Sequence, residues 1–223
     1  MDGSRSPVRS GSHHGRYASG DLSRFLRHPR EDGSSMKLSS NKSASVYRTR
    51  PLPTGSMIGK FLVAEPLIAA TRSALESVAV AGIHNRGHEG MAFWAGRSND
   101  AYTAFLQVIV PRAEHGHSRV HASREAVGEA ARVARQHRLG ILCQVHSHPG
   151  DDTRHSDGDD DLVLFPFEGM LSVVVPNFGI GFTGIEQCSV HQFQQGRWTL
   201  CDHGSVVRGM MIVPTEVDLR GKL

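Results

Sequence analysis

The chain has 223 residues, of which 39% are hydrophobic and 21% charged, so it can form one sizeable domain together with a tail. No apolar run reaches the roughly 18–20 residues of a membrane-spanning helix, and no apolar stretch near the N-terminus resembles a secretory signal. Three widely spaced cysteines argue against a disulfide framework and against a thiolate zinc site, so we expect a cytoplasmic protein.

The formal net charge of +3 is divided unevenly along the chain. Residues 1–50 contain 10 Lys and Arg against 4 Asp and Glu, and the remaining residues are mildly acidic, which argues against nucleic-acid binding by the folded part. The basic stretch is rich in Ser, Gly, Arg and His, a composition that buries too little apolar surface to fold. We therefore expect a disordered tail and linker over residues 1–55, with RPLPTG as the linker, and one domain over residues 56–223.

The predicted domain begins with a strand over residues 57–64, followed by a helix. Pro66 fits the first turn of that helix, and apolar residues recur at a helical period through residue 82. We expect the apolar face of the helix to consist of Leu67, Ala70, Leu75 and Val78.

Two strands and a second helix follow. Residues 89–97 and 101–110 are apolar enough to form strands. After a polar connection, Ser123 is expected to cap the N-terminus of a helix over residues 124–138. Gly140 stands where a glycine commonly ends a helix.

The rest of the domain is expected to consist mainly of strands. A buried strand over residues 141–148 leads into a polar loop, and the loop leads into a short helix over residues 160–166. Further strands are expected over residues 170–177, 188–194, 197–202 and 210–214, the middle two joined by a turn at residues 195–196. This mixture predicts an α+β fold, an α/β sandwich in which helices flank a mixed β-sheet.

Two histidines lie at the end of the 141–148 strand, in the stretch HSHPGDDTRHSDGD over residues 146–159. Residues i and i+2 of a strand face the same way, so His146 and His148 project together and Ser147 lies on the opposite face. Ser156 and Asp159 are three residues apart, which places both on one face of a helix that begins near Ser156. Two imidazoles and one carboxylate form a zinc ligand set with a fourth position open for water.

A zinc site of this kind hydrolyses a substrate only if a base and a hydrogen-bond donor lie beside it. Ser156 is the candidate donor to the oxyanion that develops on the scissile carbonyl. The base must come from elsewhere in the chain, because Asp159 is assigned to the metal.

The pattern H-x-H-P, six residues, S-x-x-D resembles the signature of the JAMM (JAB/MPN) zinc metalloproteases. In that family a glutamate heads an upstream strand that ends in glycine seven residues later, and EGMAFWAG, from Glu89 to Gly96, has this form. Ala92 departs from the pattern, since many relatives have glycine there. The resemblance covers roughly residues 57–200 and implies a cytidine-deaminase-like JAB/MPN fold. It also implies a Zn²⁺ cofactor held by His146, His148 and Asp159, with Glu89 and Ser156 as catalytic residues.

Other polar residues compete for these roles. Glu65 and Glu168 are alternative carboxylates, although the first fits dipole compensation at a helix start and the second lies in an expected loop. Asp157 and Asp160 would point to other faces of a helix than Asp159. Five further histidines are interpreted as polar surface residues. For His88 and His155 a lesser role at the entrance of the site stays open. No second metal site is expected at His115, His117 and His121.

The resemblance implies hydrolysis of an amide bond, most often the isopeptide bond between the C-terminal glycine of a ubiquitin-like protein and a lysine. The short loops make the chain similar to compact bacterial members of the family. Some of these are encoded beside activating-enzyme-like, conjugating-enzyme-like and ubiquitin-like proteins, several of them linked to antiphage defence. We therefore expect a ubiquitin-like protein with a Gly-ending tail as partner, in deconjugation or precursor processing, and neither a membrane nor a nucleic acid. The tail would add a strand to a sheet edge at the segment after Glu89 or around residues 98–103.

Two alternatives stay open. The same chemistry could trim a sulfur-carrier protein or a small peptide. The chain could also be a non-catalytic binding module in which zinc has a structural role.

Overall fold

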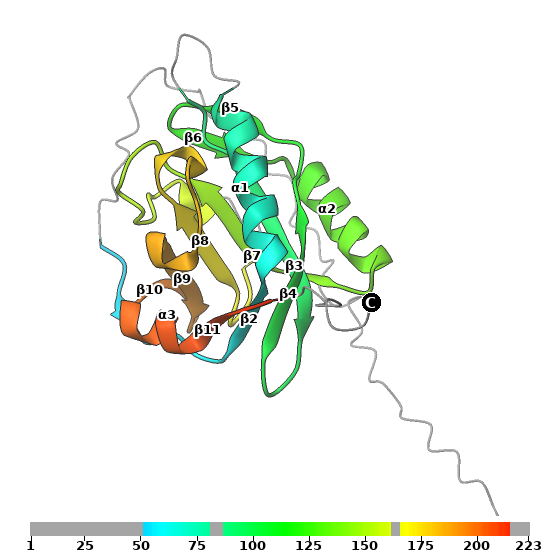
Figure 1. Cartoon of the computed structure of the whole chain (residues 1–223), viewed down its shortest axis with the longest axis vertical. Coiled ribbons are helices and arrows are strands. Elements are labelled where there is room, and N and C mark those ends of the chain that lie inside the picture. The colour runs from blue at the N-terminus through cyan, green and yellow to red at the C-terminus, as the bar shows by residue number, and fades with distance from the viewer. Residues whose placement is uncertain (1–50, 81–86, 162–165, 215–223) are drawn as a thin grey trace, which may run out of the picture. The chain divides into compact units, whose positions relative to one another are not determined.

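The computed structural model describes residues 51–80, 87–161 and 166–214 (Figure 1). The predicted disordered tail lies almost wholly outside these ranges, so that expectation remains a prediction. The strands are β1 (Thr54–Gly55), β2 (Phe61–Ala64), β3 (Met91–Ser98), β4 (Thr103–Ile109), β5 (Glu114–Gly116), β6 (Arg119–His121), β7 (Gly140–Ser147), β8 (Leu171–Val175), β9 (Ser189–Gln194), β10 (Arg197–Cys201) and β11 (Met210–Val213). The helices are α1 (Glu65–Ala79), α2 (Arg124–Gln136) and α3 (His203–Gly209), with short 3-10 turns at Asp159–Asp161, Asn177–Gly179 and Ile185–Gln187.

Nine of these strands form one mixed sheet, in the order β1-β10-β9-β8-β7-β3-β4-β2-β11. The central strand β7 runs antiparallel to β3 and parallel to β8. The helix α1 packs against β2, β3 and β4, and α2 packs against β3, β4 and β7 (Figure 1). The predicted α+β class with a mixed sheet and flanking helices is therefore confirmed.

One face of the sheet packs against α1. Pro66 lies in the first turn of this helix, as expected. The buried residues are Leu67, Ile68, Thr71, Leu75 and Ala79. The predicted apolar face was partly wrong. The buried residues follow a four-residue spacing along the helix, and this leaves Ala70 exposed and Val78 only half-buried.

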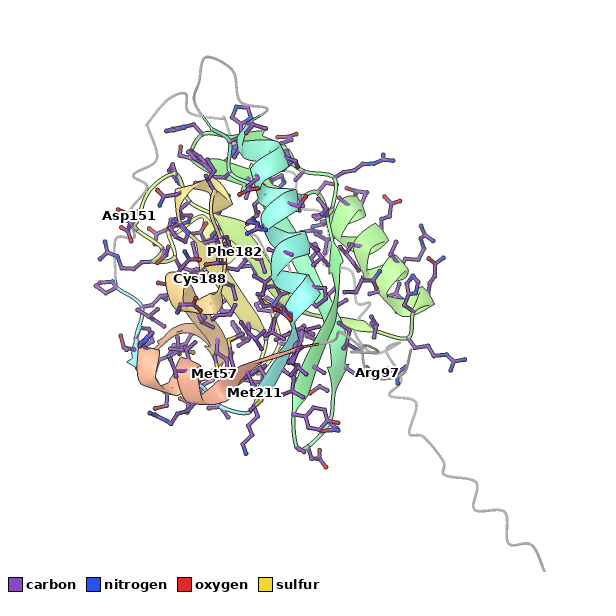
Figure 2. The ribbon with its side chains drawn as sticks, viewed as in Figure 1. Met57, Arg97, Asp151, Phe182, Cys188 and Met211 are labelled. Carbon is purple, nitrogen blue, oxygen red and sulfur yellow. The ribbon has the colours of Figure 1, made fainter. Side chains whose placement is uncertain are left out.

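The core beneath α1 is centred on Trp94, which is fully buried and tilted against Phe105 with ring centroids 5.4 Å apart. Its indole nitrogen donates to Thr71 Oγ1 at 2.8 Å. Side chains such as Phe182 and Cys188 lie within the body of the domain, whereas Arg97 and Asp151 project outward (Figure 2).

The opposite face of the sheet packs against α2. Three small residues at four-residue spacing lie against the alternate side chains of β3: Ala126, Ala130 and Ala134 against Met91, Phe93 and Ala95. Ser123 caps α2 as predicted, since its side chain accepts from the Ala126 amide at 3.3 Å. Gly140 was wrongly expected to end the helix. Arg138 takes the left-handed conformation instead, with φ of 58°, and Gly140 opens β7.

Several elements were not expected from the sequence. The strand β1, which pairs with β10, lies inside the stretch that was predicted to be a linker. The polar connection before α2 contains the β5–β6 hairpin, and α3 precedes β11. The predicted helix over residues 160–166 appears as a 3-10 turn at Asp159–Asp161, and residues 162–165 lie outside the described ranges. Among the described helices, none has the length and apolarity required to cross a bilayer.

Of the two predicted edges for strand addition, the second is wrong and the first stays a prediction. The segment after Glu89 is β3, which is paired with β7 from Met91 onward and with β4 only from Phe93 onward, so any free edge on the β4 side is limited to the residues before Phe93. Residues 98–103 join β3 to β4 at the end of β3 opposite Glu89. At about 3.3 Å per residue this turn lies roughly 23 Å along the strand from Met91, too far to guide a chain past the histidines.

Candidate metal centre

The two histidines of the H-x-H pair emerge at the end of the central strand β7. His146 is the penultimate residue of the strand, and its side chain is 1% exposed. His148 follows the last residue, and its amide donates to the Val175 carbonyl at 2.9 Å, which keeps it in line with β8. Both imidazoles are therefore fixed by the most interior part of the sheet, as the two-residue period predicted.

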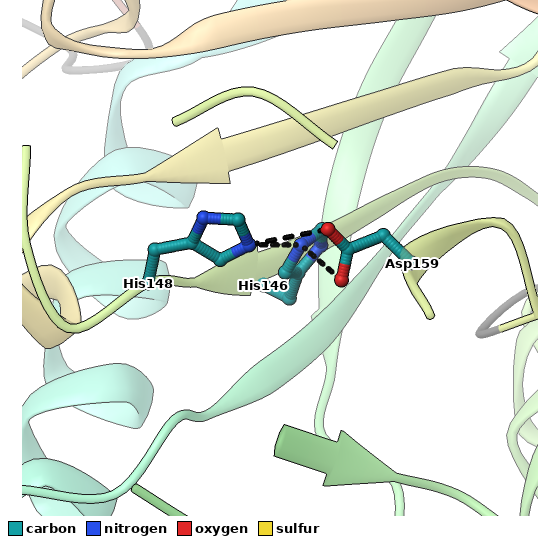
Figure 3. A group of neighbouring side chains, drawn as sticks. All are labelled: His146, His148 and Asp159. Carbon is teal, nitrogen blue, oxygen red and sulfur yellow. Dashed lines mark hydrogen bonds and ion pairs between the residues drawn. The ribbon is translucent and has the colours of Figure 1, made fainter. Parts of the chain in front are cut away.

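Three side chains converge at this point (Figure 3). His146 Nε2 lies 3.2 Å from His148 Nε2 and 3.3 Å from Asp159 Oδ1, and His148 Nε2 lies 3.2 Å from Asp159 Oδ2. A tetrahedral ion with bonds of ~2.0–2.2 Å requires its ligands to be about 3.3–3.6 Å apart. The observed separations are close to that range, and all three side chains are buried, so this group can hold a metal ion with little rearrangement.

Asp159 is carried by a tight turn rather than by a regular helix. The Ser156 amide donates to Asp159 Oδ2 at 2.6 Å, and the Asp159 amide donates back to the Ser156 carbonyl at 3.3 Å. The predicted proximity of these two residues is correct, although the structure achieves it with a 3-10 turn. The main-chain bond to one carboxylate oxygen also fixes the direction of the carboxylate.

The two imidazoles differ in their second contacts. His148 Nδ1 donates to the Asp152 carbonyl at 2.7 Å, which puts the ring proton on Nδ1 and leaves the Nε2 lone pair for a metal. His146 Nδ1 is buried and has no hydrogen-bond partner among the described residues. The loop therefore fixes the tautomer needed for metal binding, with the proton on Nδ1, for His148 but not for His146.

Glu89 lies beside the two histidines because β3 and β7 are paired. Met91 pairs with His146, and Gly90 and Ser147 exchange two bonds of 3.0 Å, one through the serine hydroxyl. Continuing this antiparallel register places Glu89 opposite His148 on the same face of the sheet. The Glu89 side chain is 4% exposed, so the structure brings the predicted base to the predicted metal ligands.

The β5–β6 hairpin holds the backbone of Glu89 from the other side. The Glu89 amide donates to the Gly116 carbonyl at 2.7 Å, and His115 Nδ1 donates to the Glu89 carbonyl at 2.9 Å. His117 Nδ1 donates to the Gly87 carbonyl at 3.1 Å. These histidines had been interpreted as residues of a polar connection, and their contacts depend on a hairpin that the sequence did not predict.

Burial and charge act differently on the two carboxyl groups. Burial raises the pKa of Glu89 to about 8, and the positive charge of His148 only partly offsets this. Burial would also raise the pKa of Asp159, but the charges and hydrogen bonds of His146 and His148 hold that pKa well below its usual range. Although burial alone would lower it, the pKa of His148 is raised, because Asp159 accepts a hydrogen bond from it and attracts its charge. One carboxyl is thus suited to carry a proton and the other to remain charged.

The competing residues lie elsewhere. Glu65 is exposed at the start of α1. Glu168 is exposed and accepts from the amides of Gln195 and Gly196 at 3.0 and 2.8 Å, so it caps the β9–β10 turn. Asp157 is exposed, and His88 is half-buried. His155 was wrongly expected to be an exposed loop residue, because its side chain is only 2% exposed.

A family model described as prokaryotic homologues of the JAB domain matches residues 71–178, a range that includes Glu89, both histidines and Asp159. A probable metalloprotease of Sinorhizobium fredii, y4jG, is 34% identical over 107 residues. Residues 71–178 are thus similar to the JAB domain of the JAMM/MPN family. The predicted resemblance to this family is therefore confirmed.

The match to the Sinorhizobium relative covers 43% of this chain and 61% of that protein, so the chain spans less than two thirds of its relative. Among solved structures, a protein of Desulfitobacterium hafniense aligns over 70% of this chain and 94% of its own, with 13% identity and a TM-score of 0.48. A JAB1/MPN domain protein of Archaeoglobus fulgidus aligns over 71% of this chain and 97% of its own, with 15% identity and a TM-score of 0.34. At these TM-scores the structural matches add nothing to the family resemblance, which rests on the family model and the sequence relative.

Proposed function

We propose that this chain is a zinc-dependent peptidase that hydrolyses the amide bond after the C-terminal glycine of a ubiquitin-like protein. The observation that carries the proposal is the buried convergence of His146, His148 and Asp159, with Glu89 in register beside His148. The similarity to the JAB-domain family and to a probable metalloprotease supports it.

The donor set fits zinc better than a hard cation. Two imidazole nitrogens and one carboxylate oxygen are typical ligands of zinc, whereas calcium and magnesium prefer oxygen ligands. Three protein ligands also leave one position for water or substrate. In that position Zn²⁺ would polarise the scissile carbonyl and make water acidic enough to lose a proton near neutral pH.

The residues of the chain would then have separate tasks. Glu89 accepts the proton of the attacking water and passes it to the departing amine, a task for which a buried carboxyl with a raised pKa is suited. Ser156 donates a hydrogen bond to the carbonyl oxygen as that oxygen gains charge. No side chain forms a bond to the substrate, so a covalent intermediate is not part of the reaction.

The substrate class comes from the family resemblance. We propose a ubiquitin-like protein with a Gly-ending tail, joined either to a lysine of a target or to a short C-terminal extension. The reaction would belong to a bacterial conjugation pathway with activating- and conjugating-enzyme-like partners, in the setting of antiphage defence.

The test uses the full chain loaded with zinc and a ubiquitin-like domain that ends in Gly-Gly, fused to a reporter through its C-terminus or through a lysine. We expect cleavage after the second glycine, loss of cleavage with a chelator, and loss of cleavage with retained zinc in Glu89→Gln. Cleavage of short peptides alone would favour a general peptidase. Bound zinc without cleavage of any fusion would overturn the proposal and favour a binding module with structural zinc.

A further inference from the structure

A second buried histidine lies next to the metal centre without belonging to it. His155 immediately precedes Ser156 in the chain and is 2% exposed. Its ring stacks on His191 with centroids 3.9 Å apart and planes inclined by 19°, and the Trp198 ring lies nearly perpendicular to it with centroids 5.3 Å apart. A loop histidine is rarely enclosed in this way, since its polar ring atoms must then find partners inside the protein.

Both ring nitrogens of His155 face such partners. Nε2 lies 2.8 Å from Ser172 Oγ on β8, and Nδ1 lies 3.4 Å from Asp160 Oδ1. Gln144 Nε2 on β7 donates to the same serine hydroxyl at 2.9 Å. The hydroxyl can therefore donate its own proton to His155 Nε2, which leaves the ring proton on Nδ1, facing Asp160.

This Asp–His–Ser arrangement has the connectivity of a nucleophilic triad but not its setting. The Ser172 side chain is fully buried, so a substrate carbonyl has no access to it. The burial of His155 also lowers its pKa, which keeps the ring neutral. The group is suited to hold structure in place rather than to react.

The network fixes both ends of the turn that carries Asp159. Before the turn, His155 is followed directly by Ser156, whose amide bonds the Asp159 carboxylate. After the turn, Asp160 follows Asp159 directly and contacts the His155 ring. Between these ends lie Asp157 and Gly158, which are both exposed.

We propose that His155 is a positioning residue, which holds the Ser156–Asp159 turn against β8 and β9 so that the Asp159 carboxylate is directed at His146 and His148. The inference rests on the proposed metal site. Outer partners of this kind typically contribute about 10–100-fold to metal affinity, because they fix a ligand before the metal arrives. Loss of the His155 ring would leave the three ligands present and one of them poorly placed.

The test measures zinc affinity of the chelator-stripped full chain by competition with a chromophoric chelator, together with the visible spectrum of the Co²⁺-loaded protein. We expect His155→Ala to weaken zinc binding by about 10–100-fold and to change the Co²⁺ spectrum. His155→Gln should recover much of the affinity, because a glutamine amide reaches the position of Nε2 and can bond Ser172. Ser172→Ala, which removes only the partner hydroxyl, should weaken binding in the same direction.

The matched control is Thr71→Ala, which removes a buried hydroxyl that bonds Trp94 on the other face of the sheet. It should lower the unfolding temperature and leave zinc affinity unchanged. Wild-type affinity and spectrum in His155→Ala, or equal affinity losses in His155→Ala and Thr71→Ala, would overturn the inference. If His155→Ala does not fold, the zinc affinities of His155→Gln and Ser172→Ala are compared with that of Thr71→Ala in the same way. Failure of the wild-type protein to bind zinc would instead overturn the proposed function.

Discussion

The buried carboxyl of Glu89 makes the stability of the metal-free protein depend on pH. Its pKa is raised from an ordinary value near 4.5 to about 8, chiefly by burial. The folded protein therefore binds this proton more tightly than the unfolded chain does, and the free energy of unfolding falls as pH rises between these two values. Integrated from pH 5 to pH 8, this single group accounts for a loss of roughly 3 kcal/mol.

The substitution Glu89→Gln isolates this contribution, because an amide of the same shape carries no titratable proton. In the chelator-stripped protein, urea unfolding of the wild type and of Glu89→Gln should give a stability difference that grows in favour of the variant by roughly 3 kcal/mol from pH 5 to pH 8. The exposed Glu65→Gln serves as control and should show no difference that grows in favour of the variant as the pH rises.

A constant difference between Glu89→Gln and the wild type would refute the reasoning, because it would mean that the Glu89 carboxylate is solvated or paired in the metal-free fold. A difference that grows in the opposite direction would show that ionised Glu89 is stabilised by His148 more than burial opposes it. Either result would also weaken the assignment of Glu89 as a proton carrier.

Substitutions at four further positions test the rest of the site and its support. Asp159→Asn should weaken zinc binding, measured by calorimetry, by more than about 100-fold, because loss of a residue that merely hydrogen-bonds a metal ligand already costs about that much. Ser156→Ala keeps the main-chain bond to Asp159 and should lower kcat by about 10²–10³-fold at unchanged zinc affinity; an equal loss of zinc would contradict its assigned role. His115→Ala should lower kcat by about 10–100-fold without loss of zinc, and His115→Asn, which can still donate to the Glu89 carbonyl, should recover activity. Gly96→Ala would place a methyl group on the Ala104 carbonyl and should cost about 1–3 kcal/mol in chemical unfolding, with zinc affinity unchanged.

The sequence was enough to predict that His146, His148 and Asp159 lie close together, because their relation is local. The period of a strand is enough to place His146 and His148 on one face, and a three-residue spacing is enough to bring Ser156 to Asp159 in either a helix or a 3-10 turn. Glu89 could not be found in this way, because its place beside His148 depends on the pairing of β3 with β7. Only the family resemblance selected it from the other carboxylates.

The missed features depend on contacts between distant parts of the chain. His155 stands in a run of polar residues, and its burial follows from Ser172 on β8 and His191 on β9. The role of His115 follows from a hairpin whose polar sequence gives no strand signal. The place of β3 inside the sheet limits the edge available for strand addition after Glu89, and strand order is a property that periodicity does not report.

The register between β3 and β7 has a consequence for how this site can change over evolutionary time. A slip of one residue between these strands would turn Glu89 or the histidines to the far side of the sheet, and the same slip would misplace Trp94 and Phe93 in the two cores. Glu89, His146 and His148 are thus inherited together with the ability to fold. Asp159 comes from a turn outside the sheet, which is held to β8 and β9 by side-chain contacts of His155, so mutations in this turn can remove the proposed metal ligand while the strands remain paired. A descendant without the proposed activity should therefore show its first changes between residues 155 and 160.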